Sequence, residues 1–185
     1  MARVRVLCGM NPVLVDVFEF ARLGQAYTGA VPVAAMPRLA TMVDNTAGEV
    51  TFTYRARVDG QGRPAGTLAV HATLNLTCNH CDRPVAFALC VQRDYYFVRD
   101  ERALAAIAVD ADDEEPLIGD TRFDLGTLVE DEVILGLPIA PRHDACQSEI
   151  EAAAATGDKD SVREPGPFAA LAALRAGADR RPKNQ

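Results

Sequence analysis

The chain has 185 residues and a formal net charge of −7, and 49% of its residues are apolar. These values are typical of one globular domain with its own core, or of one domain with a tail. The acidic balance, with only two lysines among 19 basic residues, argues against nonspecific nucleic-acid binding, and DNA is not an expected partner. The apolar runs are far shorter than the ~20 residues that span a bilayer, and no convincing export signal is present. We therefore expect a cytoplasmic protein with no membrane partner.

The N-terminal part has a mixed pattern. Residues 13–23 are apolar with interspersed charges, which is compatible with a helix or a strand; we favour a helix that ends at Gly24. Pro32 and Pro37 then bound a short passage that we expect to be extended.

The middle of the chain predicts three consecutive strands. Apolar residues alternate with threonine and arginine over 50–58, and a similar alternation follows over 68–76. Such a period of two is typical of a half-buried strand. A third strand is expected over 85–98, and short links join all three, so the sequence predicts an antiparallel meander.

A C-x-x-C pair, Cys78 and Cys81, falls between the second and third of these strands, at the tip of the predicted hairpin. Cys146 offers a third thiolate, and His143 or His80 offers a fourth ligand, which together suit one structural zinc ion. The alternative is a set of free thiols. Cys8 and Cys90 stand alone in apolar sequence and are expected to be small buried residues.

A helix is predicted over 125–137, with Asp124 as its N-cap and Pro138 after its end. Leu125, Leu128 and Val129 form an apolar stripe on a helical wheel. Glu132 falls inside this stripe, whereas Glu130 and Asp131 fall outside it. Glu132 therefore either lies at the margin of the buried face or meets a partner such as arginine, histidine or a metal. We count it among the candidate partner-binding residues.

The C-terminal part changes composition. Residues 147–166, rich in acidic residues and alanine, are expected to form a flexible linker between a single domain (1–146) and a short helix with a basic tail (167–185). Phe168 and Leu171 lie on one side of that helix, which either docks on its own domain or binds a partner.

Catalysis is not expected. The chain has three histidines and no convincing set of nucleophile, base and orienting residue. The C-x-x-C pair also lacks the strand–helix setting of a thioredoxin motif.

Two basic patches are candidates for contact with RNA. One is the polar face of the predicted sheet, with Arg55, Arg57 and His71, although such arginines also occur on ordinary solvated faces. The other is the basic tail, which contains Arg175, Arg180, Arg181 and Lys183. The aromatic run 95–97 suits either base stacking or the core.

Four blocks of the sequence, in order, resemble one family. The first block comprises residues 20–24, 27–29 and 36–39, and the third comprises residues 124–143. The second block, Leu76–Cys81, is similar to an L-x-C-x-R-C signature, with His80 in place of arginine. The fourth block, Gly166–Leu171, is similar to an N-P-F-x-x-L motif at the end of the family's sequences. From end to end the chain resembles the YceD family of large ribosomal RNA subunit accumulation proteins.

The resemblance implies a bacterial, cytoplasmic, non-catalytic factor needed for normal levels of 23S ribosomal RNA and for biogenesis of the large ribosomal subunit. The expected α+β fold is an antiparallel β meander with a C-x-x-C hairpin tip, a few packed helices and a flexible C-terminal arm. We expect it to bind precursor rRNA or an early large-subunit ribosomal protein. The alternative is a metal-stabilised protein-interaction module that acts indirectly on rRNA levels.

Overall fold

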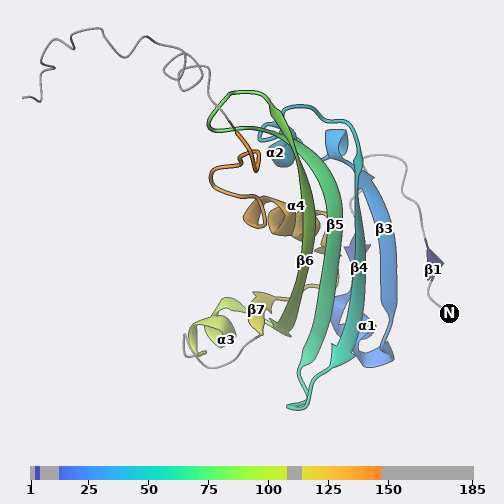
Figure 1. Ribbon diagram of the computed structural model, residues 1–185. Helices are drawn as coiled ribbons and strands as arrows, with labels where there is room; N and C mark the ends of the chain where they lie inside the picture. The colour runs from blue at the N-terminus through green and yellow to red at the C-terminus, as the bar shows by residue number, and fades with distance from the viewer. Residues whose placement is uncertain (1–2, 5–12, 108–113, 147–185) are drawn as a thin grey trace, which may run out of the picture. The chain divides into compact units, whose positions relative to one another are not determined.

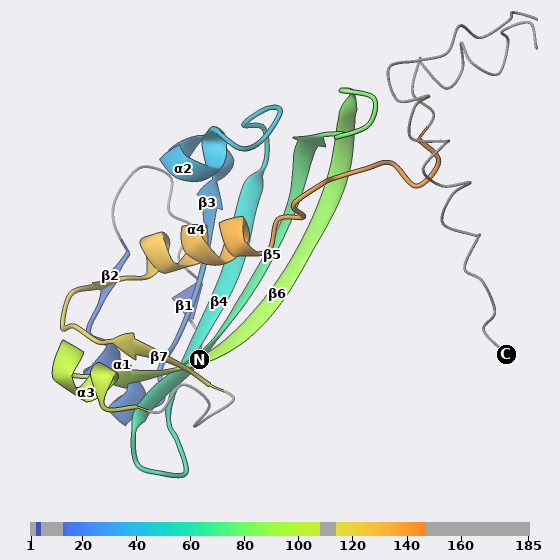
Figure 2. The ribbon, with the colours of Figure 1, turned by 90° about the vertical axis from the view of Figure 1, so that its left-hand side faces the viewer.

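The computed structural model describes residues 3–4, 13–107 and 114–146, in which helices pack on one face of a large sheet (Figure 1 and Figure 2). That sheet has six strands in the order β1-β3-β4-β5-β6-β7. At its centre, β4 (Glu49–Val58), β5 (Pro64–Thr77) and β6 (Pro84–Val98) pair antiparallel in chain order. The α+β fold class and the antiparallel meander predicted from the sequence are therefore confirmed.

Further strands extend this meander. β3 (Ala26–Pro32) pairs antiparallel with β4, whereas β1 (Arg3–Val4) and β7 (Glu115–Ile118) pair parallel at the two sides. β2 (Leu14–Val15) and β8 (Phe123–Asp124) form a separate two-stranded sheet. The sequence patterns predicted none of these five strands, because four of them have only two to four residues and β3 shows no alternation of apolar and polar residues.

The N-terminal helix α1 (Val17–Leu23) ends at Gly24, as predicted, where the backbone adopts a left-handed φ of 58°. It begins later than expected. The Asp16 side chain accepts hydrogen bonds from the backbone N–H groups of Phe18 and Glu19, at 3.0 Å each, and so fixes the first turn. The residues before Asp16 are not helical because β2 pairs with β8.

The next segment differs from the extended passage that its prolines suggested. Val33–Ala35 form a 3-10 turn, and α2 (Pro37–Ala40) follows with its proline at the start of the helix. Proline is well tolerated there because the first helical N–H has no partner within the helix. α3 (Glu101–Ala105) links β6 to the segment that leads into β7.

The helix α4 (Leu125–Leu135) packs over the sheet on the same side as α1 and α2 (Figure 2). Asp124 is its N-cap, as predicted, and accepts from the Gly126 N–H at 2.9 Å. The helix ends at Leu135, two residues before the predicted end at Leu137. Its apolar stripe is buried at Leu125, Leu128 and Val129.

The core lies between these helices and one face of the sheet. The apolar residues of the β4 alternation, Val50, Phe52 and Tyr54, are buried, and they lie opposite Ala72, Val70 and Leu68 of β5 in the strand register. The aromatic run of β6, residues 95–97, is also buried. Tyr95 and Phe97 therefore belong to the core. Tyr96 points to the other face of the sheet, where the guanidinium of Arg63 lies 3.7 Å from its ring centroid. None of the three rings is exposed, so their interpretation as a stacking surface is wrong.

The opposite face of the sheet carries small and polar side chains, and in the described part of the chain no helix covers it (Figure 1). Its exposed residues on the three central strands include Thr51, Arg55, His71, Thr73, Ala86, Ala88, Cys90 and Gln92. Cys90 is thus exposed, and the prediction that it is buried is wrong. Its place on the strand, two residues from Ala88, directs its side chain to the bare face.

No helix within the described ranges is long and apolar enough to cross a membrane. The expected linker and C-terminal helix (147–185) and Cys8 lie outside the described residues.

Candidate metal centre

Three thiols and one imidazole gather at the turn between β5 and β6. Cys78 and Cys81 lie in this turn, as predicted, and His143 and Cys146 come from the segment after α4. One ligand atom from each residue lies within 4.8 Å of the other three. The Sγ atoms of Cys78 and Cys146 are 3.6 Å apart, and Cys81 Sγ is 3.6 Å from His143 Nδ1. The structure thus brings together the three cysteines that the sequence singled out and one of the two candidate histidines, His143.

The backbone of the turn positions the first pair of thiols. The Cys78 N–H donates to the Arg83 carbonyl at 2.9 Å, and the Asp82 N–H donates to the Cys78 carbonyl at 3.0 Å. Asp82 adopts a φ of 54°, a left-handed conformation that aspartate tolerates better than most residues. The Asn79 N–H donates to the Pro141 carbonyl at 2.8 Å. This last bond holds the segment after α4 against the turn.

The imidazole of His143 has a defined orientation. Its Nε2 lies 3.0 Å from the Pro84 carbonyl oxygen, which can only accept a hydrogen bond. Nε2 must therefore carry the proton, and in the neutral ring Nδ1 is left as the acceptor that faces Cys81. A metal-binding histidine is commonly oriented in this way by a carbonyl on its other nitrogen. His80 lies beside the group, with Nδ1 3.2 Å from Cys146 Sγ.

The surroundings shift the pKa values of the three thiols in different directions. Burial alone would raise the pKa of Cys78, but hydrogen bonds from the backbone N–H groups of His80, His143 and Cys81 outweigh it and lower the pKa to about 5. The hydrogen bond with the Arg83 side chain, then that with its backbone, lowers the pKa of Cys81. Burial, followed by the neighbouring thiols of Cys81 and Cys78, raises the pKa of Cys146 to about 12.

This arrangement has the chemistry of a zinc site. Three sulfurs and one imidazole nitrogen are a common donor set for a tetrahedral structural zinc ion. Cys78 already favours the thiolate that binds metal. The hydrogen bond to Cys78, and then that to the Pro84 carbonyl, raise the pKa of His143. A cation among the sulfurs would oppose that protonation.

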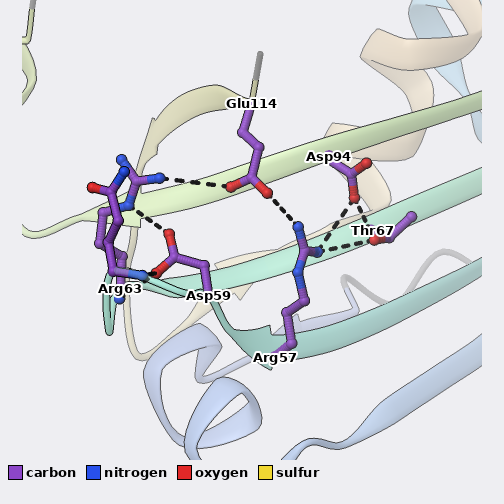
Figure 3. A network of polar contacts seen from close by, with 7 residues as sticks. Arg57, Asp59, Arg63, Thr67, Asp94 and Glu114 are labelled. Carbon is purple, nitrogen blue, oxygen red and sulfur yellow. Dashed lines mark hydrogen bonds and ion pairs between the residues drawn. The ribbon is translucent and has the colours of Figure 1, made fainter. Parts of the chain in front are cut away.

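Away from this cluster, Arg57 lies in a polar network on the bare face of the sheet (Figure 3). Its guanidinium donates to Thr67 Oγ1 at 3.0 Å, to Asp94 Oδ1 at 3.3 Å, and to Glu114. The charge of Arg57 is thus balanced by carboxylates of its own chain. Arg55 and His71, also proposed from the sequence as contact residues, are exposed on the same face.

Glu132 lies beneath the other face of the sheet. It is 3% exposed and accepts from Arg93 Nε of β6 at 2.8 Å. The helical wheel left two interpretations open. The one in which Glu132 meets an arginine, a histidine or a metal is correct, because Glu132 pairs with Arg93 of the same chain. The remaining predicted contact residues, Phe168, Leu171, Arg175, Arg180, Arg181 and Lys183, lie outside the described residues.

The sequence patterns missed a second carboxylate contact. Glu130 is 7% exposed, although the helical wheel placed it outside the apolar stripe. Its Oε1 accepts from the backbone N–H groups of Arg38 and Leu39 at 2.8 and 3.0 Å, and Oε2 accepts from Arg38 Nε at 3.1 Å. Glu130 therefore caps the start of α2 from a different helix. The only sequence signal was the presence of both segments among the family-like blocks.

These features define a class: an α+β protein with one bare sheet face and a cysteine–histidine cluster at a hairpin tip. A family model described as large ribosomal RNA subunit accumulation protein YceD matches residues 66–175, which include that cluster, and the chain belongs to this family. The large ribosomal RNA subunit accumulation protein YceD of Haemophilus influenzae is 28% identical over 173 residues, and the match covers 89% of this chain and 95% of that protein. No solved structure matches the chain.

Proposed function

We propose that the protein is a non-catalytic cytoplasmic factor needed for 23S rRNA accumulation and for biogenesis of the large ribosomal subunit. It acts by binding precursor rRNA or an early ribosomal protein of that subunit. Membership of the family supports the link to large-subunit rRNA, and the name of the Haemophilus relative states the same role for that protein.

The net charge, together with the pairing of several arginines, favours a basic ribosomal protein as the direct partner. Within the described ranges, five arginines form ion pairs with carboxylates of the same chain: Arg22, Arg38, Arg57, Arg63 and Arg93. Binding to RNA gains most of its affinity when unpaired cations displace the counterions of phosphates. A chain with a net charge of −7 is better matched to a cationic protein. On the bare face, Arg55 and His71 remain the candidate contacts with phosphate.

The four residues of the cysteine–histidine cluster hold one structural zinc ion in this proposal. All four tetrahedral positions are supplied by the protein, so no position is left for an activated water. The ion would join the β5–β6 turn to the segment after α4, which already contacts it through Asn79 and Pro141. The alternative function, a metal-stabilised interaction module that acts indirectly on rRNA, rests on this same site.

Binding assays with the purified protein separate the two partners. Fragments of precursor 23S rRNA are titrated over a range of salt concentrations, and large-subunit ribosomal proteins are tested individually with nuclease present. Direct RNA binding predicts a steep fall in affinity with salt and a loss in Arg55→Glu, but not in Arg102→Glu on α3. A protein partner predicts a complex that forms without RNA. Binding to neither would overturn the proposal, and salt-insensitive binding through residues 168–174 would favour the alternative.

A further inference from the structure

One edge of the large sheet is only partly paired. β6 pairs with β5 from Pro84 to Tyr96, whereas β7 pairs with β6 only at Tyr95–Val98. Within the part of the chain that the structure describes, residues 85–94 of β6 therefore form an edge of the sheet, and this edge is visible beyond β7 in Figure 2. At its start, the Pro84 carbonyl contacts His143.

The direction of the backbone groups on this edge follows from the register. The bond from the Cys78 N–H to the Arg83 carbonyl marks one bonded pair of the β5–β6 ladder. Because bonded pairs alternate in an antiparallel ladder, the odd-numbered residues of β6 direct their N–H and C=O groups to β5. Two even-numbered residues agree with this direction. The Pro84 carbonyl accepts from His143 and the Val98 carbonyl accepts from the Gly119 N–H, and neither donor lies on β5.

Four residues thus direct both backbone groups outward: Ala86, Ala88, Cys90 and Gln92. No described residue bonds to these groups. The strand is also uncharged from Pro84 to Gln92, although natural proteins usually protect an exposed edge with charges, bulges or a covering segment. Beside the edge, Gly136 packs on Leu89 and Val91, and the adjacent Leu135 is 66% exposed.

We propose that this edge binds the same edge of a second copy of the chain, so that two six-stranded sheets join antiparallel through β6. Because this part of β6 carries no charge, it would not favour binding of a basic or an acidic segment. For the same reason, pairing with β6 of a second copy places no like charges opposite each other. In one register, the four outward residues of each copy lie opposite the four of the other. Ala86 then faces Gln92 of the second copy, Ala88 faces Cys90, and Leu89 lies opposite its own equivalent on the two-fold axis. This inference does not depend on the proposed function.

Cross-linking of the full-length chain tests the register. In Ala88→Cys, the new thiol lies opposite Cys90 of the second copy, at the ~5.5 Å Cα separation of a bonded pair, which suits a disulfide. Oxidation with diamide is therefore expected to give a covalent dimer in which the introduced thiol is joined to Cys90, as peptide mapping would show. Thr51→Cys, exposed on the same face of β4, is the matched control and should give none. A cross-link that does not involve Cys90, or equal cross-linking of the control, overturns the proposed register.

Sedimentation velocity tests the dimer itself. The wild-type chain is expected to dimerise, and Ala88→Lys to raise the dimer dissociation constant by about tenfold or more, since it places a charge at each bonded pair near the axis. Thr51→Lys should leave the dimer unchanged. Both substitutions are at exposed positions, and circular dichroism verifies that the variants are folded. A wild-type chain that stays monomeric at all concentrations, or a dimer unaffected by Ala88→Lys, overturns the proposal.

Discussion

Arg93 of β6 and Glu132 of α4 form an ion pair in which the arginine is half-exposed and the carboxylate is buried, with side-chain exposures of 47% and 3%. The pair joins the edge strand to the helix that covers it. Since the carboxylate of Glu132 is removed from water, the guanidinium of Arg93 is what makes its burial tolerable.

Loss of Arg93 should therefore destabilise the fold. We expect Arg93→Met to lower the free energy of unfolding by about 2 kcal/mol, less than for a fully buried pair because Arg93 is partly solvated. Urea denaturation measures this effect. Arg55→Met, at an exposed arginine on the opposite face, should change stability by less than ~0.5 kcal/mol. The double variant Arg93→Met with Glu132→Leu should recover most of the loss, and an equal effect of the two single arginine variants would contradict this interpretation.

The cap that Glu130 provides predicts a second difference. Glu130→Ala removes the acceptor of the Arg38 and Leu39 N–H groups, so we expect a loss of about 2 kcal/mol in unfolding free energy. Asp131→Ala removes only a contact with the exposed guanidinium of Arg38 and should cost ~0.5 kcal/mol or less. Thermal unfolding of both variants is the comparison. If Asp131→Ala lowers the free energy of unfolding as much as Glu130→Ala does, the capping role of Glu130 is wrong.

Metal content tests the cysteine–histidine cluster. Protein purified without chelator should carry about one zinc ion per chain, measured by mass spectrometry of the element. Cys146→Ser should lose most of the zinc and unfold at a lower temperature. Cys90→Ser, which changes an exposed thiol outside the cluster, should retain it. Zinc-free wild-type protein with a freely alkylated Cys78 would instead support the interpretation as free thiols.

The unequal pKa values predict how zinc binding depends on pH. At pH 8 the Cys78 thiol, with a pKa of about 5, is already ionised, whereas the Cys146 thiol, with a pKa of about 12, holds its proton. Zinc must displace that proton, so zinc affinity should rise with pH above neutrality. Calorimetry in buffers of different ionisation enthalpy counts the protons released. With zinc added to saturation, the number of protons released per bound zinc ion should fall by about one in Cys146→Ser and change little in Cys78→Ser. The opposite result would show that Cys78, and not Cys146, holds the proton.

The sequence predicted the parts of the fold that repeat a clear period. Alternation located β4, β5 and β6, and the C-x-x-C spacing located the turn that gathers the cluster. Asp124 and Gly24 marked a helix start and a helix end correctly because caps are local features.

Other features depend on contacts between distant segments. Glu130 is buried because α2 covers the flank of α4, and a wheel drawn for one helix contains no information about a second. Cys90 is exposed because no helix among the described residues covers its face of the sheet; the small residues around it looked apolar in sequence. The parallel strand β7 has only four residues and begins at the end of an acidic run. It is too short to show a periodic pattern, so the sequence did not predict it.

Cross-linking of the protein in growing bacterial cells, followed by sequencing of the attached RNA and identification of the attached proteins, tests the central proposal most directly. The proposed function predicts that immature large-subunit particles are recovered. It further predicts either RNA reads concentrated at one region of 23S rRNA or one predominant large-subunit ribosomal protein. Recovery of neither above the background of an untagged strain would contradict the proposed function.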